Sequence, residues 1–299
     1  MVSLKLFRRR QVKSSVLDIP LDKYDRYTGL PKVIRIGEDN LTPFVSLQET
    51  RDHLTFLNSL STLRAAIPGD LPDAFPTLCL ESAKAYAYWA QTILPNRGKE
   101  GAVLQEELPS LQVLMAWHAH LLNPTIYAKE LEGVYAALAN LDFPLAAIAT
   151  AIRQETLPTF QPVTPDKEKS LMKTVWSSED IGKAIERQAK FIGNMERIGW
   201  LRDQYWEKGL TELQFSIVLY HAWLDLMQST QSKYFLVPRL DIDLAWHTHQ
   251  LHHTRYKADT IRILGKLLNH NDAAGDEKIG DGLEVTKKLW KDRFGWEYQ

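Results

Sequence analysis

The sequence predicts a mostly α-helical protein, and three features indicate this fold class. Apolar residues recur at helical spacing along most of the 299-residue chain. Several of these segments begin with residues that favour a helix start, such as Ser46 and the pair Asn123–Pro124. Strand signals are weak, because few β-branched residues alternate and no Asn-Gly or Asp-Gly pair joins such runs. We therefore expect a helical domain with little sheet.

The predicted helices follow one another from residue 46 to the end of the chain. They cover residues 46–66, 75–94, a segment around His118, 124–141, 177–201, 211–229, a segment within 241–256, and 283–295. The acidic, glycine-rich stretch Gly275–Gly282 lacks this periodicity and is predicted to be a turn-rich loop.

The chain is predicted to have three parts. Residues 1–45 carry a basic cluster and scattered prolines, and are expected to form an irregular basic N-terminal lead-in. The proline-rich segment 156–166 marks the predicted boundary between a first helical half, residues 46–160, and a second, residues 161–299.

Composition narrows the classes of function. The formal net charge of -1 gives no global basic field that would attract nucleic acid or an anionic membrane. No apolar run is long enough for a transmembrane helix. The single cysteine, Cys79, excludes an internal disulfide and fits a reducing, cytoplasmic setting.

Two segments of the chain share one pattern. The template P-x-L-x-[VI]-x-[LM]-A-W-H-x-H-x(6)-Y begins at Pro109 and again at Pro238. It aligns Trp117 with Trp246, His118 with His247, His120 with His249, and Tyr127 with Tyr256. The repeat predicts two similar helical halves related by a pseudo-twofold axis, with the histidines near their junction.

The two copies differ in their polar residues. The second copy has Asp241 and Asp243 where the first has Gln112 and Leu114, and it has His252-His253 where the first has Asn123-Pro124. We therefore expect a metal or catalytic site on the second half, with His118 either contributing to it or only packing.

These segments also carry a family resemblance. "LMAWHAHLLNPTIY" and "DIDLAWHTHQLHHTRY" resemble the paired signatures of the glycine-rich domain-containing protein-like family. The closing "GLEVTKKLWKDRFGWEYQ" and the segment "LGKLLNHND", which contains His270, are also similar to that family, although Asn269 stands where the family often has histidine. The resemblance covers roughly residues 45–299. It implies a mainly helical domain and no particular chemistry.

Asp243 and His247 are the centre of the candidate site. They share one helix face, because residues i and i+4 are neighbours on a helix. A carboxylate and an imidazole so placed either bind one metal or form an acid–base pair, for which His118 is the third catalytic candidate. As further metal ligands, the family-like segment suggests His270, the repeat suggests His118, and His249 is a tentative addition. Two histidines and a carboxylate suit iron, manganese or zinc.

Two functions remain open. The first is an enzyme acting on a small organic ligand, with the site between the halves, by metal-dependent oxidation or hydrolysis or by acid–base cyclisation or condensation. The alternative is a non-catalytic helical interaction module in which the WHxH segments are structural. In that alternative, His249, His252 and His253 are solvated or cap helix ends.

Overall fold

The computed structural model describes residues 19, 23–97, 101–207, 209–270 and 272–298, so residues 1–18 and 20–22 of the predicted basic lead-in lie outside it. The prediction of a mostly α-helical fold is confirmed. The helices are α1 (Leu47–Ala65), α2 (Ala74–Tyr88), α3 (Leu111–Leu121), α4 (Pro124–Glu130), α5 (Leu145–Arg153), α6 (Pro165–Lys169), α7 (Ser178–Arg197), α8 (Asp203–Trp206), α9 (Thr211–Ser229), α10 (Leu240–Gln250), α11 (His253–Leu264) and α12 (Asp276–Phe294). The strands β1 (Ile34–Ile36) and β2 (Asp39–Leu41) pair antiparallel.

Helix α1 begins where the sequence predicts. The Ser46 hydroxyl accepts the backbone N–H of Glu49, and the Glu49 carboxylate accepts the backbone N–H of Ser46 at 2.7 Å. This reciprocal capping box satisfies two N–H groups that have no partner within the helix.

The structure forms helices that the sequence did not predict, among them α5, α6 and α8, and it departs from the predicted elements in other places, including the following three. Residues 34–41, expected to be irregular, form the hairpin because Ile34 and Ile36 are buried and β1 packs on α9. The helix predicted over 124–141 stops at Glu130 and gives way to a short 3-10 turn. The loop predicted at Gly275–Gly282 is wrong, since α12 starts at Asp276.

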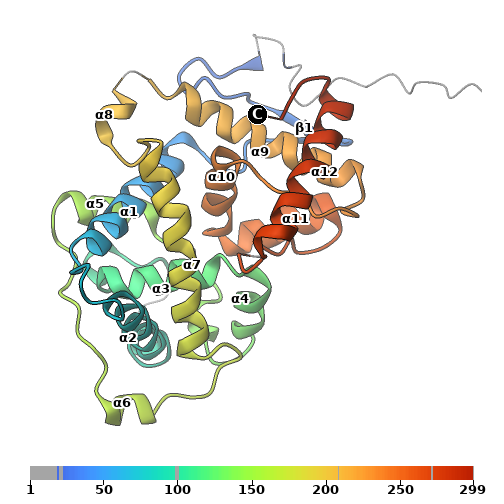
Figure 1. Ribbon diagram of the computed structural model, residues 1–299. Helices are drawn as coiled ribbons and strands as arrows, with labels where there is room; N and C mark the ends of the chain where they lie inside the picture. The colour runs from blue at the N-terminus through green and yellow to red at the C-terminus, as the bar shows by residue number, and fades with distance from the viewer. Residues whose placement is uncertain (1–18, 20–22, 98–100, 208, 271, 299) are drawn as a thin grey trace, which may run out of the picture.

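Helix α7 runs through the middle of the view in Figure 1, with α1, α2 and α5 to one side and α4, α10, α11 and α12 to the other. It packs on α1, α2 and α3 and also contacts α10. Helix α1, from the first half, packs in turn on α9 and α10. One continuous apolar core therefore contains residues from both predicted halves.

The sequence repeat corresponds to repeated contacts. Trp117 Nε1 donates to the Tyr127 hydroxyl at 3.0 Å, and Trp246 Nε1 donates to the Tyr256 hydroxyl at 2.9 Å. The second histidine of each motif also has the same partner. Tyr86 lies 3.1 Å from His120 Nδ1, and Tyr220 lies 3.0 Å from His249 Nδ1. The two units are thus locally alike, while a twofold operation relating the whole halves stays a prediction.

Candidate metal centre

Helix α10 places Asp243 and His247 one turn apart on one face. His247 Nε2 lies 3.4 Å from Asp243 Oδ1. The His247 side chain is buried, whereas Asp243 keeps 21% of its side-chain surface exposed. The carboxylate therefore remains reachable from solvent while the imidazole is fixed in the protein interior.

His270 meets this pair from the segment after α11. The Tyr256 hydroxyl donates to Leu268 O at 2.8 Å and holds that segment against the helix. His270 Nδ1 donates to Leu122 O at 2.8 Å. Because a carbonyl oxygen only accepts, Nδ1 carries the proton and Nε2 keeps its lone pair. This Nε2 lies 3.2 Å from His247 Nε2.

The ligand atoms of Asp243, His247 and His270 lie within 4.8 Å of one another, the single such group of three among the residues that the structure describes. A metal about 2.0–2.1 Å from nitrogen and oxygen ligands in a tetrahedral site separates them by roughly 3.3–3.4 Å. The His247–His270 separation of 3.2 Å and the Asp243–His247 separation of 3.4 Å match this spacing, and the third separation is at most 4.8 Å. Within the described chain Asp243 Oδ1 accepts no hydrogen bond. The three residues fit a divalent cation.

The electrostatics of the cluster agree with ligand roles. Burial lowers the pKa of His247 far below its usual value, and neighbouring His270, His53 and His118 lower it further. Burial also lowers the pKa of His270. Both imidazoles are therefore neutral at physiological pH, which is the form that binds metals. Without a cation, burial raises the pKa of Asp243 to about 8, and a bound cation acts in the opposite direction.

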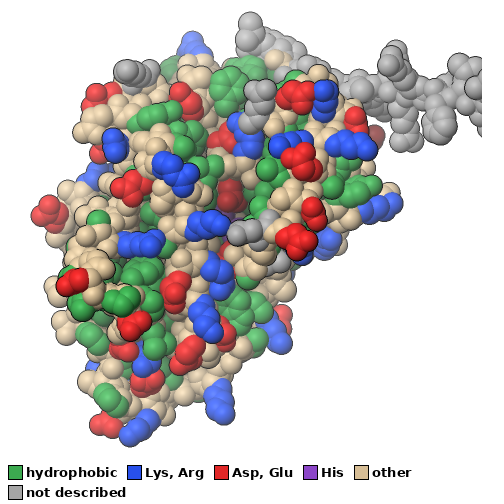
Figure 2. Space-filling model, viewed as in Figure 1, with side chains coloured by type: hydrophobic (Ala, Val, Ile, Leu, Met, Phe, Trp, Pro, Cys, Tyr) green, Lys and Arg blue, Asp and Glu red, His purple; other side chains and the backbone are tan. Residues whose placement is uncertain are grey.

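A cavity of about 750 Å³ opens in front of the cluster. Asp243, His247 and His270 line it together with Trp223, Trp246 and Phe191. Figure 2 shows this face hollowed between α7 and α12, with Lys and Arg side chains gathered along α7. Aromatic side chains thus line the cavity beside the histidine cluster.

His118 lies apart from the cluster, in a second pair of histidines. His118 Nε2 is 3.0 Å from His53 Nε2, and His53 Nδ1 is 2.9 Å from the Thr248 hydroxyl. Thr248 donates its own proton to Leu244 O, so His53 is the donor to Thr248 and accepts from His118. His118 borders a separate cavity of about 280 Å³.

His249 is not brought to the cluster, which corrects its tentative place among the ligands. Its Nδ1 lies 3.0 Å from the Tyr220 hydroxyl and its Nε2 lies 3.1 Å from Asp259 Oδ2. The physical reason is helical geometry, because a residue two positions from His247 points to the opposite side. The expectation that His249 is solvated is also wrong, since the residue is fully buried.

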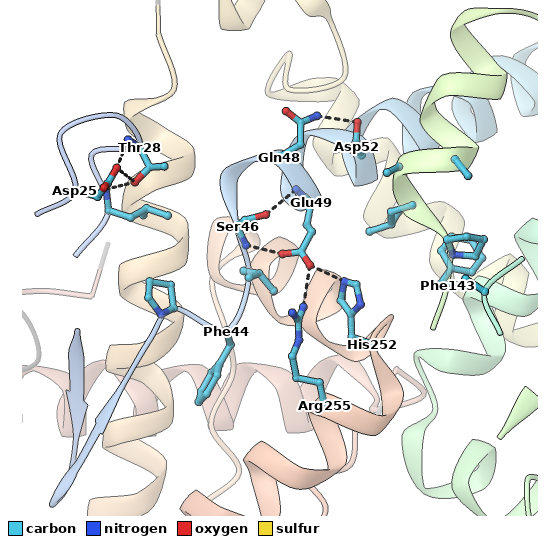
Figure 3. Close-up of a pocket in the computed structure, with 18 of the residues that line it drawn as sticks. Asp25, Thr28, Phe44, Ser46, Gln48, Glu49, Asp52, Phe143, His252 and Arg255 are labelled. Atoms are coloured by element: carbon cyan, nitrogen blue, oxygen red, sulfur yellow. Dashed lines mark hydrogen bonds and ion pairs between the residues drawn. The ribbon is translucent and has the colours of Figure 1, made fainter. Parts of the chain in front are cut away.

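A larger cavity, about 830 Å³, lies beside the start of α1. Its charged side chains already satisfy one another, as Figure 3 shows: Glu49 Oε1 is 3.0 Å from Arg255 and 3.1 Å from His252 Nε2. We therefore place the candidate site at Asp243, His247 and His270, where three possible ligand atoms converge.

Comparison with known proteins agrees with the sequence motifs. A family model described as "Glycine-rich domain-containing protein-like" matches residues 152–259. The family resemblance predicted from the sequence is confirmed. The matched region contains Asp243 and His247 and ends before His270.

Two curated relatives extend the similarity beyond that region. Glycine-rich domain-containing protein 2 of Arabidopsis thaliana is 27% identical over 273 residues, which are 84% of this chain and 33% of the relative. Glycine-rich domain-containing protein 1 of the same plant is 26% identical over 274 residues, which are 84% of this chain and 32% of that protein. The chain thus spans about a third of their length. No solved structure matches significantly, and no helix in the described ranges is long and apolar enough to cross a membrane.

Sequence reasoning missed two parts of the site. The carbonyl of Leu122 orients His270, and a backbone group leaves no signal in the sequence. His53 was not among the predicted site residues, yet it joins His118 to Thr248. Leu122 follows α3, so the first half of the chain holds a residue of the second half in position.

Proposed function

We propose that the protein is a metal-dependent enzyme acting on a small organic molecule, with Asp243, His247 and His270 holding one divalent metal. The observation that carries this proposal is the convergence of three ligand atoms beside an aromatic-lined cavity. The hydrogen bond from His270 Nδ1 to a backbone carbonyl is the outer contact that metal-binding histidines ordinarily have.

The donor set limits the metal and its chemistry. Two imidazoles and one carboxylate leave coordination positions open for water or substrate, as in catalytic iron, manganese and zinc sites. Such a metal supplies a Lewis acid, an activated water or, for iron, a site for oxygen chemistry. The residues of the chain hold it, and the cavity aligns the substrate beside it.

Metal content tests the proposal. We expect purified protein, resupplied with iron, manganese or zinc, to retain close to one metal per chain by elemental analysis. His247→Ala and Asp243→Asn should lose most of that metal, because each removes one of three ligands. Asp243→Asn should melt within a few degrees of the metal-free wild type, since Asp243 Oδ1 accepts no hydrogen bond from the described residues.

His253→Ala is the matched control, because His253 lies near the cluster in sequence but outside it in space. It should keep its metal. A wild type that stays metal-free after resupply sinks the proposal. The alternative, a structural interaction module, is favoured by the Trp–Tyr and Tyr–His contacts repeated in both halves. It predicts instead that Asp243→Asn lowers the melting temperature strongly while no variant changes metal content.

A further inference from the structure

The cavity in front of the metal cluster also has features that select a ligand, and this inference rests on the proposed function. The part of the cavity beside the cluster is aromatic: the Phe191 ring lies 4.4 Å from the His247 ring, and the Trp246 ring lies 4.8 Å from the His270 ring. These contacts fix the imidazoles against flat apolar surfaces. A ligand bound beside the cluster would contact the same surfaces.

Aliphatic side chains also line the cavity. They belong to Met227, Leu236, Val237, Leu240, Leu268 and Ile279. A volume of about 750 Å³ lies in the range that accommodates a drug-sized organic molecule. The walls therefore favour an apolar body of one or two rings, or the equivalent length of alkyl chain, over a sugar or a peptide.

The charges lining the cavity are mostly positive. Arg187, Lys190, Lys266 and Lys278 line it, against the carboxylates Asp243 and Asp272. Asp272 is already engaged by Arg187, whose Nε lies 3.0 Å from it, and by the Gln188 amide at 3.3 Å. Asp243 belongs to the metal cluster. Lys266 and Lys278 form no ion pair with a carboxylate among the residues that the structure describes.

One of these cations is held on the apolar wall itself. Lys278 Nζ lies 4.7 Å from the centroid of the Phe235 ring, so a cation–π contact places its charge beside a hydrophobic surface. Lys266 lines the same cavity from the segment between α11 and His270. A ligand with an apolar body and one anionic end matches this combination.

We infer that the substrate is a hydrophobic carboxylate, whose apolar body lies against Trp223, Trp246 and Phe191 and whose carboxylate is held by Lys266 and Lys278. Cationic molecules are repelled by the lysines. Neutral analogues keep the apolar contacts but lose the ion pairs. A bound metal also attracts anions, so the contribution of the lysines is measured on metal-free protein.

Three probes with one ring system test this inference: naphthalene-2-carboxylate, 2-naphthalenemethanol and 2-naphthylmethylammonium. Isothermal titration calorimetry should show the carboxylate binding about three- to tenfold more tightly than the alcohol, the range expected for two partly exposed ion pairs. The ammonium should bind most weakly. The double variant Lys266→Gln/Lys278→Gln should bring the carboxylate to within about twofold of the alcohol and leave the alcohol unchanged.

The control is Lys183→Gln/Lys288→Gln, which removes the same charge from α7 and α12 outside the cavity. It should retain the preference. His247→Ala should also retain it, so that loss of metal and loss of anion selectivity are measured separately. Equal binding of the three probes, binding of none, or a preference that survives in Lys266→Gln/Lys278→Gln overturns the inference.

Discussion

Individual residues of the WHxH motif have different roles. Trp117 and Trp246 each donate to the tyrosine ten positions later, and the second histidine of each copy bonds a tyrosine from a preceding helix. These positions are structural in both halves. The first histidine differs, because His118 pairs with His53 whereas His247 faces Asp243 and His270. We therefore assign metal binding to the first histidine of the second copy, His247, and not to the first histidine of the first copy, His118.

His252 is a second titratable residue with a defined environment. Its Nε2 lies 3.1 Å from Glu49 and its Nδ1 lies 3.5 Å from Asp142, so it joins α1 to the segment before α5 (Figure 3). Burial alone would lower its pKa, but the hydrogen bonds with Asp142 and Glu49 outweigh burial, and the pKa is raised. The charged imidazole thus stabilises the fold.

The sign of the pH effect follows from this raised pKa. The stabilisation that His252 contributes is complete at pH values below its unfolded-state pKa of about 6.5. It is lost as the pH rises through its folded-state pKa. We expect the stability difference between wild type and His252→Gln, measured by urea unfolding, to shrink as the pH is raised from slightly acidic to mildly alkaline.

His253→Gln provides a comparison of opposite sign. Burial lowers the pKa of His253, so its protonation opposes folding, and the wild type should gain stability over that variant as the pH rises. A difference between wild type and His252→Gln that stays constant or grows with pH would show that its two carboxylate contacts do not act as described.

The first turns of helix α12 depend on close packing against another segment of the chain. Gly280 and Gly282 are both helical, yet only Gly282 is buried. A Cβ atom at Gly282 would lie 2.7 Å from Phe235 Cδ1 and 3.0 Å from Phe235 O. At Gly280 nothing lies within 4 Å. The glycine at 282 therefore permits close contact with the segment that forms one wall of the cavity.

Alanine at these two positions should have opposite effects on stability. Gly280→Ala should raise the free energy of unfolding by about 0.5–1 kcal/mol, because alanine loses less conformational entropy in a helix. Gly282→Ala should lower it by about 1–3 kcal/mol through overpacking against a backbone oxygen that cannot rotate away. Urea unfolding of both variants measures this. Equal stabilisation by the two substitutions would mean that α12 does not pack on Phe235 as the structure shows.

The elements differ in how far the sequence could predict them. Helix α1 was predictable because Ser46 and Glu49 form a local capping signal, and the face shared by Asp243 and His247 follows from helical periodicity. The hairpin was not, because strands of three residues show no alternation. Gly275–Gly282 was predicted to be a loop from its glycines, but packing on Phe235 and Val237 overrides that local preference. His270 was suggested by the family resemblance, but the Leu122 carbonyl that holds it could not be predicted, because a backbone group leaves no signal in the sequence.

At the scale of the whole molecule, the two predicted halves share their packing. Helix α7 contacts α1, α2 and α3 on one side and α10 on the other, while α1 packs on α9 and α10. The metal cluster has the same dependence, because Leu122, at the end of α3, orients His270. The site is therefore complete only when both halves are folded against each other.

We therefore expect the protein to unfold in one cooperative transition by calorimetry, and the metal to move that entire transition. A ligand bound only by the folded state at about 100 times its Kd adds roughly 2.7 kcal/mol, enough to raise the melting temperature by several degrees. His247→Ala should unfold in one transition that metal does not move. Two transitions, with metal shifting only one, would show that the halves fold independently. A site shared through α3, α7 and α10 requires instead a single transition that metal shifts as a whole. The cluster forms only when all of these helices are in place, so metal that stabilises the cluster also stabilises each of them.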